Sequence, residues 1–242
     1  MLLIDAGNSR IKSAAYTNGA IVRYAPVATE SPSPPVQWKE AETPASVVVS
    51  NVAGVDVAAK LTRWTLDAWA IKPTFVQVRR RAGGMRTQYD DPTKLGVDRW
   101  LAALAAYRLA GRAVVVVDAG TAITLDVVSG SGVHLGGSIS PGLKLMIDSL
   151  THNTAGLRSD SIEQIEGIAT NTASAISTGC IDAVVGGIER ATRAIAASLD
   201  ATPAWVITGG GATEIMKYCH IEFRNVPDLV LQGLVFATND AT

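Results

Sequence analysis

The chain has 242 residues, of which 48% are hydrophobic and 18% charged, so it can bury the core of one large domain or of two ordinary ones. Its 21 basic and 22 acidic residues leave a net charge of −1, which argues against the large basic surface of a nucleic-acid-binding protein. The two cysteines, Cys180 and Cys219, lack CxxC spacing, which excludes a disulfide framework or a cysteine zinc site.

The first half of the chain predicts a strand and a hairpin, followed by alternating strands and a helix. Residues 17–19 (Thr-Asn-Gly) form a turn signal between two apolar runs, as in a β-hairpin. The proline-rich residues 26–35 favour a surface loop, because proline disrupts helices and central strands. The expected strands are 2–4, 11–16, 20–24, 46–50 and 74–78, and the expected helix is 57–70.

The second half repeats this order, again with a glycine-rich hairpin turn, at residues 129–132. The polar residues 151–170 allow two interpretations, an ordinary connecting loop with a short helix or a lid that forms part of a substrate wall. The expected strands are 113–117, 123–128, 133–135 and 205–208, and the expected helices are 143–150, 181–199 and 227–237, the last with Pro227 at its start.

Because both halves run strand, hairpin, then alternating helix and strand, the sequence predicts an α/β fold with mixed sheets. The boundary between the halves is expected within residues 85–112, near a helix that starts close to Asp98. We place the division between two domains, residues 1–105 and 106–242.

The chain shows no sign of a targeting or membrane segment. The apolar run before Asp5 is too short for the core of a signal peptide. No run approaches the roughly 18 apolar residues of a membrane helix. We therefore expect a cytoplasmic protein without a membrane partner.

One motif occurs twice, each time at the end of an apolar strand: LLIDAGNS (2–9) and VVVVDAGTA (114–122). The two aspartates, Asp5 and Asp118, lie 118 − 5 = 113 residues apart, close to half the chain. A carboxylate at a strand end suits Mg²⁺, and the following glycine lets main-chain N–H groups approach a phosphate. A single Asp-x-Gly is more often plain turn chemistry, but two copies in matched contexts favour a duplicated, nucleotide-binding fold.

Other phosphate-binding signatures are missing or weak. The chain has neither a GxxxxGK[ST] loop nor a strand–GxGxxG–helix unit, so a P-loop or a dinucleotide fold is not supported. Residues 206–212 (VITGGGA) form a strand that ends in three glycines, and such open backbone allows either a nucleoside contact or a simple turn.

A third segment, residues 89–100 (YDDPTKLGVDRW), places Asp98 and Arg99 at an expected helix start. An acid at this position is ordinarily a cap that stabilises the helix by about 0.5–2 kcal/mol. The functional alternative is a general base beside an anion-binding arginine, with Tyr89 contributing a ring or a hydroxyl.

These motifs together resemble a type III pantothenate kinase, across nearly the whole chain and in the order of that family. The segments that carry the resemblance are 5–12 (DAGNSRIK), 89–100, 118–128 (DAGTAITLDVV), 135–142 (LGGSISPG), 171–179 (NTASAISTG) and 207–212 (ITGGGA). The resemblance implies two tandem ribonuclease-H-like domains of the actin-like ATPase fold, with a nucleotide cleft between them. It also implies a homodimer that phosphorylates pantothenate with ATP in the first step of coenzyme A synthesis.

The resemblance further implies roles for individual residues. Asp98 is the expected catalytic proton acceptor. Asp5 is the expected Mg²⁺ ligand, and Asp118 matches a position that holds a monovalent cation, K⁺ or NH₄⁺, in some members. The residues expected to bind ATP are Asp5, Ala6, Gly7, Asn8, Ser9, Arg10, Ile11, Lys12 and Thr121. The residues expected to bind pantothenate are Tyr89, Gly96, Val97, Asp98, Arg99 and Thr172.

The chain departs from the usual family pattern at Ser9, where threonine is common, and at Val97, where alanine is frequent. Two alternatives stay open: a non-catalytic accessory factor in transcription with the same fold, and another small-molecule kinase of the superfamily. The three histidines lie outside all of these motifs, and each is expected to be a surface or core-filling residue. They are His134, His152 and His220.

Overall fold

The computed structural model describes residues 1–30, 33–39, 42–152, 167–199 and 201–239. The chain divides into two compact units. The first unit comprises Met1–Gly111, Gly132–Leu135 and Asp228–Thr242, and the second comprises Arg112–Ser131 and Gly136–Pro227. The predicted division between residues 105 and 106, which falls inside a helix of the first unit, stays a prediction.

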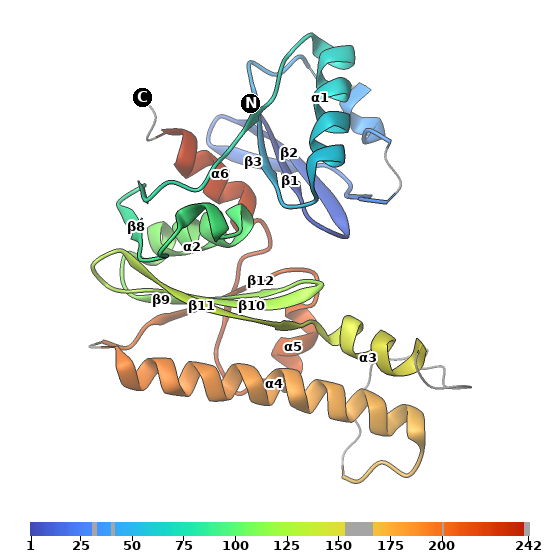
Figure 1. The fold of residues 1–242 in the computed structure, drawn as a ribbon, viewed down its shortest axis with the longest axis vertical. Coiled ribbons are helices and arrows are strands. Elements are labelled where there is room, and N and C mark those ends of the chain that lie inside the picture. The colour runs from blue at the N-terminus through green and yellow to red at the C-terminus, as the bar shows by residue number, and fades with distance from the viewer. Residues whose placement is uncertain (31–32, 40–41, 153–166, 200, 240–242) are drawn as a thin grey trace. The chain divides into compact units, whose positions relative to one another are not determined.

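The sheet of the first unit is built around β1 (Leu2–Ala6), whose five residues are all buried. This strand pairs antiparallel with β2 (Arg10–Thr17) and parallel with β5 (Val47–Asn51). The aliphatic composition of β1 and the run of valines in β5 suit strands that are covered on both faces. The outer strands β3 (Ala20–Arg23) and β6 (Thr74–Phe75) complete the order β3-β2-β1-β5-β6, of which Figure 1 labels β1, β2 and β3.

Tryptophans fill much of the core between this sheet and helix α1 (Val55–Trp69). Trp38 comes from the short 3₁₀ helix η1 (Val36–Lys39) and packs edge-on against Trp64, with ring centroids 6.2 Å apart. Its indole Nε1 donates a hydrogen bond to Ser13 Oγ over 3.1 Å, which satisfies the buried N–H group.

The sheet of the second unit is built around β9 (Val114–Ala119) in the same way. This strand pairs antiparallel with β10 (Ala122–Val128) and parallel with β12 (Ala204–Thr208). With β11 (Val133–Pro141) and β13 (Arg224–Asn225), five of the seven strands of this sheet lie in the order β11-β10-β9-β12-β13, and β8 (Met85–Thr87) and β7 (Arg81–Ala82) continue it beyond β11. The five strands match the order β3-β2-β1-β5-β6 of the first unit, so the predicted duplication and the predicted α/β fold with mixed sheets are confirmed.

Helix α4 (Thr172–Ser198) runs along the sheet of the second unit, which Figure 1 shows as a long helix below β9 and β10. Its buried side chains recur at helical spacing and share one core cluster with those strands and with α5 (Ala212–Tyr218). The residues of α4 in that cluster are Ile181, Val184, Val185 and Ile188. A further helix, α3 (Leu143–His152), follows β11.

Helix α2 (Val97–Ala110) belongs to the first unit. It packs against α6 (Leu229–Asn239) and against β5, so the C-terminal helix lies beside α2, as Figure 1 shows. The residues from Arg99 to Ala106 are all buried. Such a helix can hold the side chains at its N-terminus in fixed positions.

Several element boundaries differ from the sequence-based expectation. Besides the short 3₁₀ helices, five short elements were not predicted, because two or three strand residues or a seven-residue helix give no clear periodicity: β4 (Val27–Ala28), β7 (Arg81–Ala82), β8 (Met85–Thr87), β13 and α5. Helix α4 starts at Thr172 rather than residue 181, since its first turns are polar. Strand β11 continues to Pro141 through the glycines at which we expected it to end.

None of the described helices is long and apolar enough to cross a membrane. Neither cysteine forms a disulfide. Burial raises the pKa of the thiols of Cys180 and Cys219, so both stay protonated at neutral pH.

Candidate active site

Asp5 lies next to the end of β1, inside the strand rather than after it, and its side chain is buried. Across the ladder its direct partner on β2 is Lys12, whose Nζ lies 3.8 Å from Asp5 Oδ2. A carboxylate and an ammonium group are thus held together at one end of the sheet. Asp5 can hold a metal ion there while Lys12 adds a charge for phosphate oxygens.

The loop that follows Asp5 is held in shape by hydrogen bonds. The N–H of Gly7 donates to the carbonyl of Arg10 over 3.0 Å, which closes the turn. Thr29 fastens the turn from outside: its Oγ1 donates to the carbonyl of Gly7 over 2.7 Å, and its N–H donates to the carbonyl of Ser9 over 3.1 Å. The exposed residues Asn8, Ser9 and Arg10 therefore sit on a preformed loop.

Thr29 was missed by the sequence analysis, which placed it in a featureless proline-rich loop. Its neighbours Val27 and Ala28 form β4, which pairs with β2 at Ile11 and Arg10. The pairing brings Thr29 to the turn after Asp5, although about twenty residues separate the two in the chain. The only sequence signal was a pair of β-favouring residues before the threonine, and such a signal is too short to use.

Asp98 is the second residue of α2, directly after Val97. Its Oδ1 accepts a hydrogen bond of 2.8 Å from the N–H of Arg99, and its side chain remains partly exposed. The helix N-terminus carries a positive partial charge that stabilises the carboxylate. A Cβ at Gly96 would lie 2.7 Å from Asp98 Oδ1, so the glycine is what leaves room for the carboxylate in this position.

The segment before α2 is also capped by an aspartate. Asp91 Oδ1 accepts hydrogen bonds from the hydroxyl of Thr93 over 2.7 Å and from its N–H over 2.9 Å, at the start of the 3₁₀ helix η2 (Pro92–Lys94). The bond from the Thr93 hydroxyl, followed by that from its N–H, lowers the pKa of Asp91. The cap is thus charged at neutral pH.

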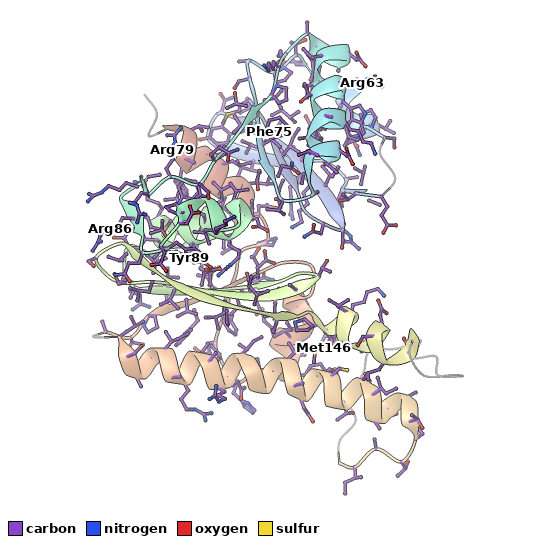
Figure 2. The ribbon with its side chains drawn as sticks, viewed as in Figure 1. Arg63, Phe75, Arg79, Arg86, Tyr89 and Met146 are labelled. Carbon is purple, nitrogen blue, oxygen red and sulfur yellow. The ribbon has the colours of Figure 1, made fainter. Side chains whose placement is uncertain are left out.

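Arg99 and Tyr89 meet beside Asp98. Arg99 is 8% exposed, and its Nη1 donates to the hydroxyl oxygen of Tyr89 over 3.2 Å. Tyr89, labelled in Figure 2, comes from the loop that follows β8, so the ring and the guanidinium are supplied by different elements of the first unit. A carboxylate, a guanidinium and a phenol hydroxyl converge here, which is a set that can bind a polar substrate and take up a proton.

The second copy of the motif has a different environment. Asp118 pairs across the ladder with Thr124 of β10, at the position where Asp5 has Lys12. The loop with Thr121 is bound to the start of α3, because the N–H of Gly142 donates to the carbonyl of Thr121 over 2.9 Å. The two copies therefore share a fold but not a charge pattern.

Gly209 is the first of the three glycines that follow β12, and its surroundings require a glycine. Its φ is +92°, and an added Cβ would overlap the Asp118 carboxylate and the backbone of Ala119. Gly211 holds the same edge through its N–H, which donates to the carbonyl of Ala119 over 2.8 Å. The glycine run thus has a structural function beside Asp118.

The predicted site residues fall into two groups. Those in the loop after β1 and at the start of α2 belong to the first unit, and Asp118, Thr121 and Thr172 belong to the second. Thr172 is the exposed first residue of α4, where the Asn171 side chain caps the helix by accepting from the N–H of Ser174 over 2.9 Å.

The donor set fits a magnesium ion that is bound mainly through a nucleotide. Among the described residues there is no group of three or more His, Cys, Asp or Glu side chains that forms a complete metal cage. Mg²⁺ typically takes one or two carboxylates and completes its shell with phosphates and water. A single buried carboxylate at Asp5, next to a loop with exposed main chain, matches that pattern.

Comparison with known proteins gives a consistent result. Residues 1–194 match the family described as type III pantothenate kinase. A protein of that name from Nitrosococcus oceani is 38% identical, with 100% of this chain and 95% of the relative covered. Another from Aromatoleum aromaticum is also 38% identical, with coverage of 100% and 99%.

Solved structures support the fold alone, since their sequences are distant. A Campylobacter jejuni protein assigned to the Baf family of transcriptional activators has a TM-score of 0.63 at 21% identity, with 100% of this chain and 98% of that chain covered. A Sinorhizobium meliloti protein assigned as a 2-dehydro-3-deoxygalactonokinase has a TM-score of 0.56 at 14% identity, with 98% of each chain covered.

Proposed function

The chain belongs to the type III pantothenate kinase family, which phosphorylates pantothenate with ATP in the first step of coenzyme A biosynthesis, and we propose that Asp98 accepts the proton in this reaction. The observation that carries this role is the hydrogen bond from the N–H of Arg99 to Asp98 Oδ1, which orients the carboxylate at the start of a buried helix. As the hydroxyl oxygen of pantothenate forms its bond to the γ-phosphorus of ATP, the hydroxyl proton passes to Asp98. The bond between the γ-phosphorus and the oxygen that bridges it to the β-phosphate breaks, and ADP leaves with the electron pair of that bond.

Arg99, Tyr89 and the start of α2 form the proposed pantothenate site. Arg99 is suited to pair with the substrate carboxylate, since a guanidinium is charged at all relevant pH values. Tyr89 adds a hydroxyl beside the guanidinium of Arg99. Gly96 and Val97 are proposed to bring the main chain close to the bound pantothenate. Thr172 is proposed as a further contact.

The proposed phosphate site is the loop from Asp5 to Lys12, with a contribution from Thr121. Asp5 would hold the magnesium ion of the nucleotide, which supplies charge neutralisation for the β- and γ-phosphates. The preformed turn after Asp5 offers main-chain N–H groups, and Lys12 offers an ammonium group. Asp118, whose ladder partner on β10 is Thr124, is proposed to bind a monovalent cation such as K⁺ or NH₄⁺.

The first test is an assay of ADP release with magnesium, ATP and pantothenate. We expect release that depends on pantothenate, with a further dependence on K⁺ or NH₄⁺ if Asp118 holds such an ion. A panel of sugars and acetate in place of pantothenate is expected to give no release. If pantothenate gives none with either cation present, the kinase assignment of this chain is wrong.

Thr29 provides a test of the phosphate loop. Thr29→Val removes the hydroxyl that holds the Gly7 carbonyl, a bond that contributes about 0.5–1.5 kcal/mol. We expect the KM for ATP to rise about threefold to tenfold, with the KM for pantothenate unchanged. Thr29→Ser, which keeps the hydroxyl, is the matched control. If Thr29→Val and Thr29→Ser had the same KM for ATP, a role of the Thr29 hydroxyl in shaping the loop would be contradicted.

A non-catalytic role in transcription is the second candidate, because the Baf-family structure has the same fold. The enzyme is favoured, since the chain has every polar residue to which a role in the kinase reaction is proposed: Asp5, Asp98, Arg99, Asp118 and Thr121. A net charge of −1 also argues against direct binding to nucleic acid. We further propose that the protein is cytoplasmic and that it forms a homodimer. Sedimentation velocity can test the dimer.

A further inference from the structure

His134 is a core residue, as expected, and its side chain also makes a hydrogen bond inside the core. It lies on the part of β11 that belongs to the first unit and is 0% exposed. The parallel pairing of β11 with β8 places it directly opposite Thr87. Its Nδ1 lies 3.1 Å from Thr87 Oγ1, so a buried imidazole and a buried hydroxyl are hydrogen-bonded to each other.

Both His134 and Thr87 contact Tyr89. The N–H of Tyr89 donates to Thr87 Oγ1 over 3.1 Å, and the Tyr89 ring stacks on the imidazole with centroids 6.0 Å apart and an interplanar angle of 22°. The N–H of Gln88 donates to the carbonyl of His134 over 3.0 Å, which extends the pairing to the residue before the tyrosine. His134 therefore contacts both the ring of Tyr89 and, through Thr87, its main chain.

Arg80 holds the other side of the same residue. Its guanidinium donates to the carbonyls of Tyr89, over 3.4 Å, and Asp90, over 3.2 Å. Tyr89 is thus fastened at its N–H, at its carbonyl and on one ring face. A loop residue with so many restraints is held in one orientation, as binding residues must be.

The direction of the bond to Arg99 determines what Tyr89 can offer a ligand. A guanidinium has donors and no acceptor, so the Tyr89 oxygen must accept from Arg99 Nη1. The single proton of the phenol is therefore not used in this bond. A phenol hydroxyl that accepts one hydrogen bond can still donate another, for example to a carbonyl or hydroxyl oxygen of a ligand.

We propose that His134 is a positioning residue for substrate recognition: with Thr87 it holds Tyr89 so that the phenol, while accepting from Arg99, donates its proton to an acceptor oxygen of pantothenate. The inference rests on the proposed function, because it takes Tyr89 and Arg99 as substrate-binding residues. The inference assigns a role to His134, which lies outside all the motifs described in the sequence analysis. The residue does not touch substrate and acts through Tyr89.

His134→Phe is the discriminating variant, since it keeps a buried ring of similar size and removes Nδ1. If His134 only fills space, this change is tolerated. If it positions Tyr89, the KM for pantothenate rises about fivefold to twentyfold, while kcat and the KM for ATP change less than about threefold. Thr87→Val is expected to have the same effect, and Thr87→Ser to restore the KM to within about twofold of wild type.

A double-mutant cycle with Tyr89→Phe completes the test. When the phenol hydroxyl is already absent, His134→Phe is expected to add no further increase in the KM for pantothenate. The inference is overturned if His134→Phe and Thr87→Val both fold and keep the wild-type KM, or if the effects of His134→Phe and Tyr89→Phe multiply. A wild-type protein without pantothenate-dependent ADP release overturns the proposed function itself, before any variant is compared.

Discussion

Asp98→Asn is expected to lower kcat for pantothenate phosphorylation by about 10²–10⁴-fold, the usual contribution of a general base. The reason is chemical rather than structural. An asparagine Oδ1 can still accept the 2.8 Å hydrogen bond from the N–H of Arg99, but the amide cannot take up a proton. The loss of negative charge at the N-terminus of α2 lowers stability by only about 0.3–1 kcal/mol.

A neighbouring carboxylate supplies the matched control. Asp91 also accepts a main-chain N–H at the start of a short helix and lies seven positions before Asp98, but it is fully exposed. Asp91→Asn is expected to leave kcat within about twofold of wild type. Isothermal titration should show that Asp98→Asn still binds pantothenate. A kcat near the wild-type value for folded Asp98→Asn would exclude Asp98 as the base.

The local parts of this site could be predicted from the sequence, and the parts built by distant pairing could not. Asp5 and Asp98 stand beside a glycine turn and a helix start, which are patterns of a few neighbouring residues. The bond from His134 to Thr87 joins residues 47 positions apart and depends on the register of two parallel strands. Thr29 depends on a two-residue strand in the same way.

The fold followed the same rule. The doubled order of strand, hairpin and alternating elements was predicted because each half has clear apolar runs of period two or 3.6. Trp38 was not recognised as core, because it follows a proline-rich segment and no periodicity includes it. Its burial is decided by tertiary contacts with Trp64 and Ser13, which a single sequence does not reveal.

Gly233→Ala is expected to destabilise the protein by about 2–4 kcal/mol, although alanine is the better helix former by about 1 kcal/mol. Gly233 lies in α6 where that helix meets α2, and an added Cβ would lie 2.7 Å from the carbonyl carbon of Leu101 and 2.8 Å from its Cβ. The obstacle includes main chain, so a change of rotamer cannot relieve it. The two helices must separate, which opens gaps around Leu101 and Leu234, both fully buried.

Calorimetry should show the midpoint of thermal unfolding of Gly233→Ala lowered by roughly 5–15 °C. Gly187→Ala in α4 is the opposite control, because Gly187 is exposed and its added Cβ would meet nothing within 4 Å. Helix propensity then acts alone, and the change is expected to stabilise by about 0.5–1 kcal/mol. If both substitutions stabilised the protein, the close approach of α6 to α2 would be wrong. Since α2 carries Asp98 and Arg99, Gly233→Ala should also reduce kcat at temperatures where the variant remains folded, which links the C-terminal helix to the position of the proposed base.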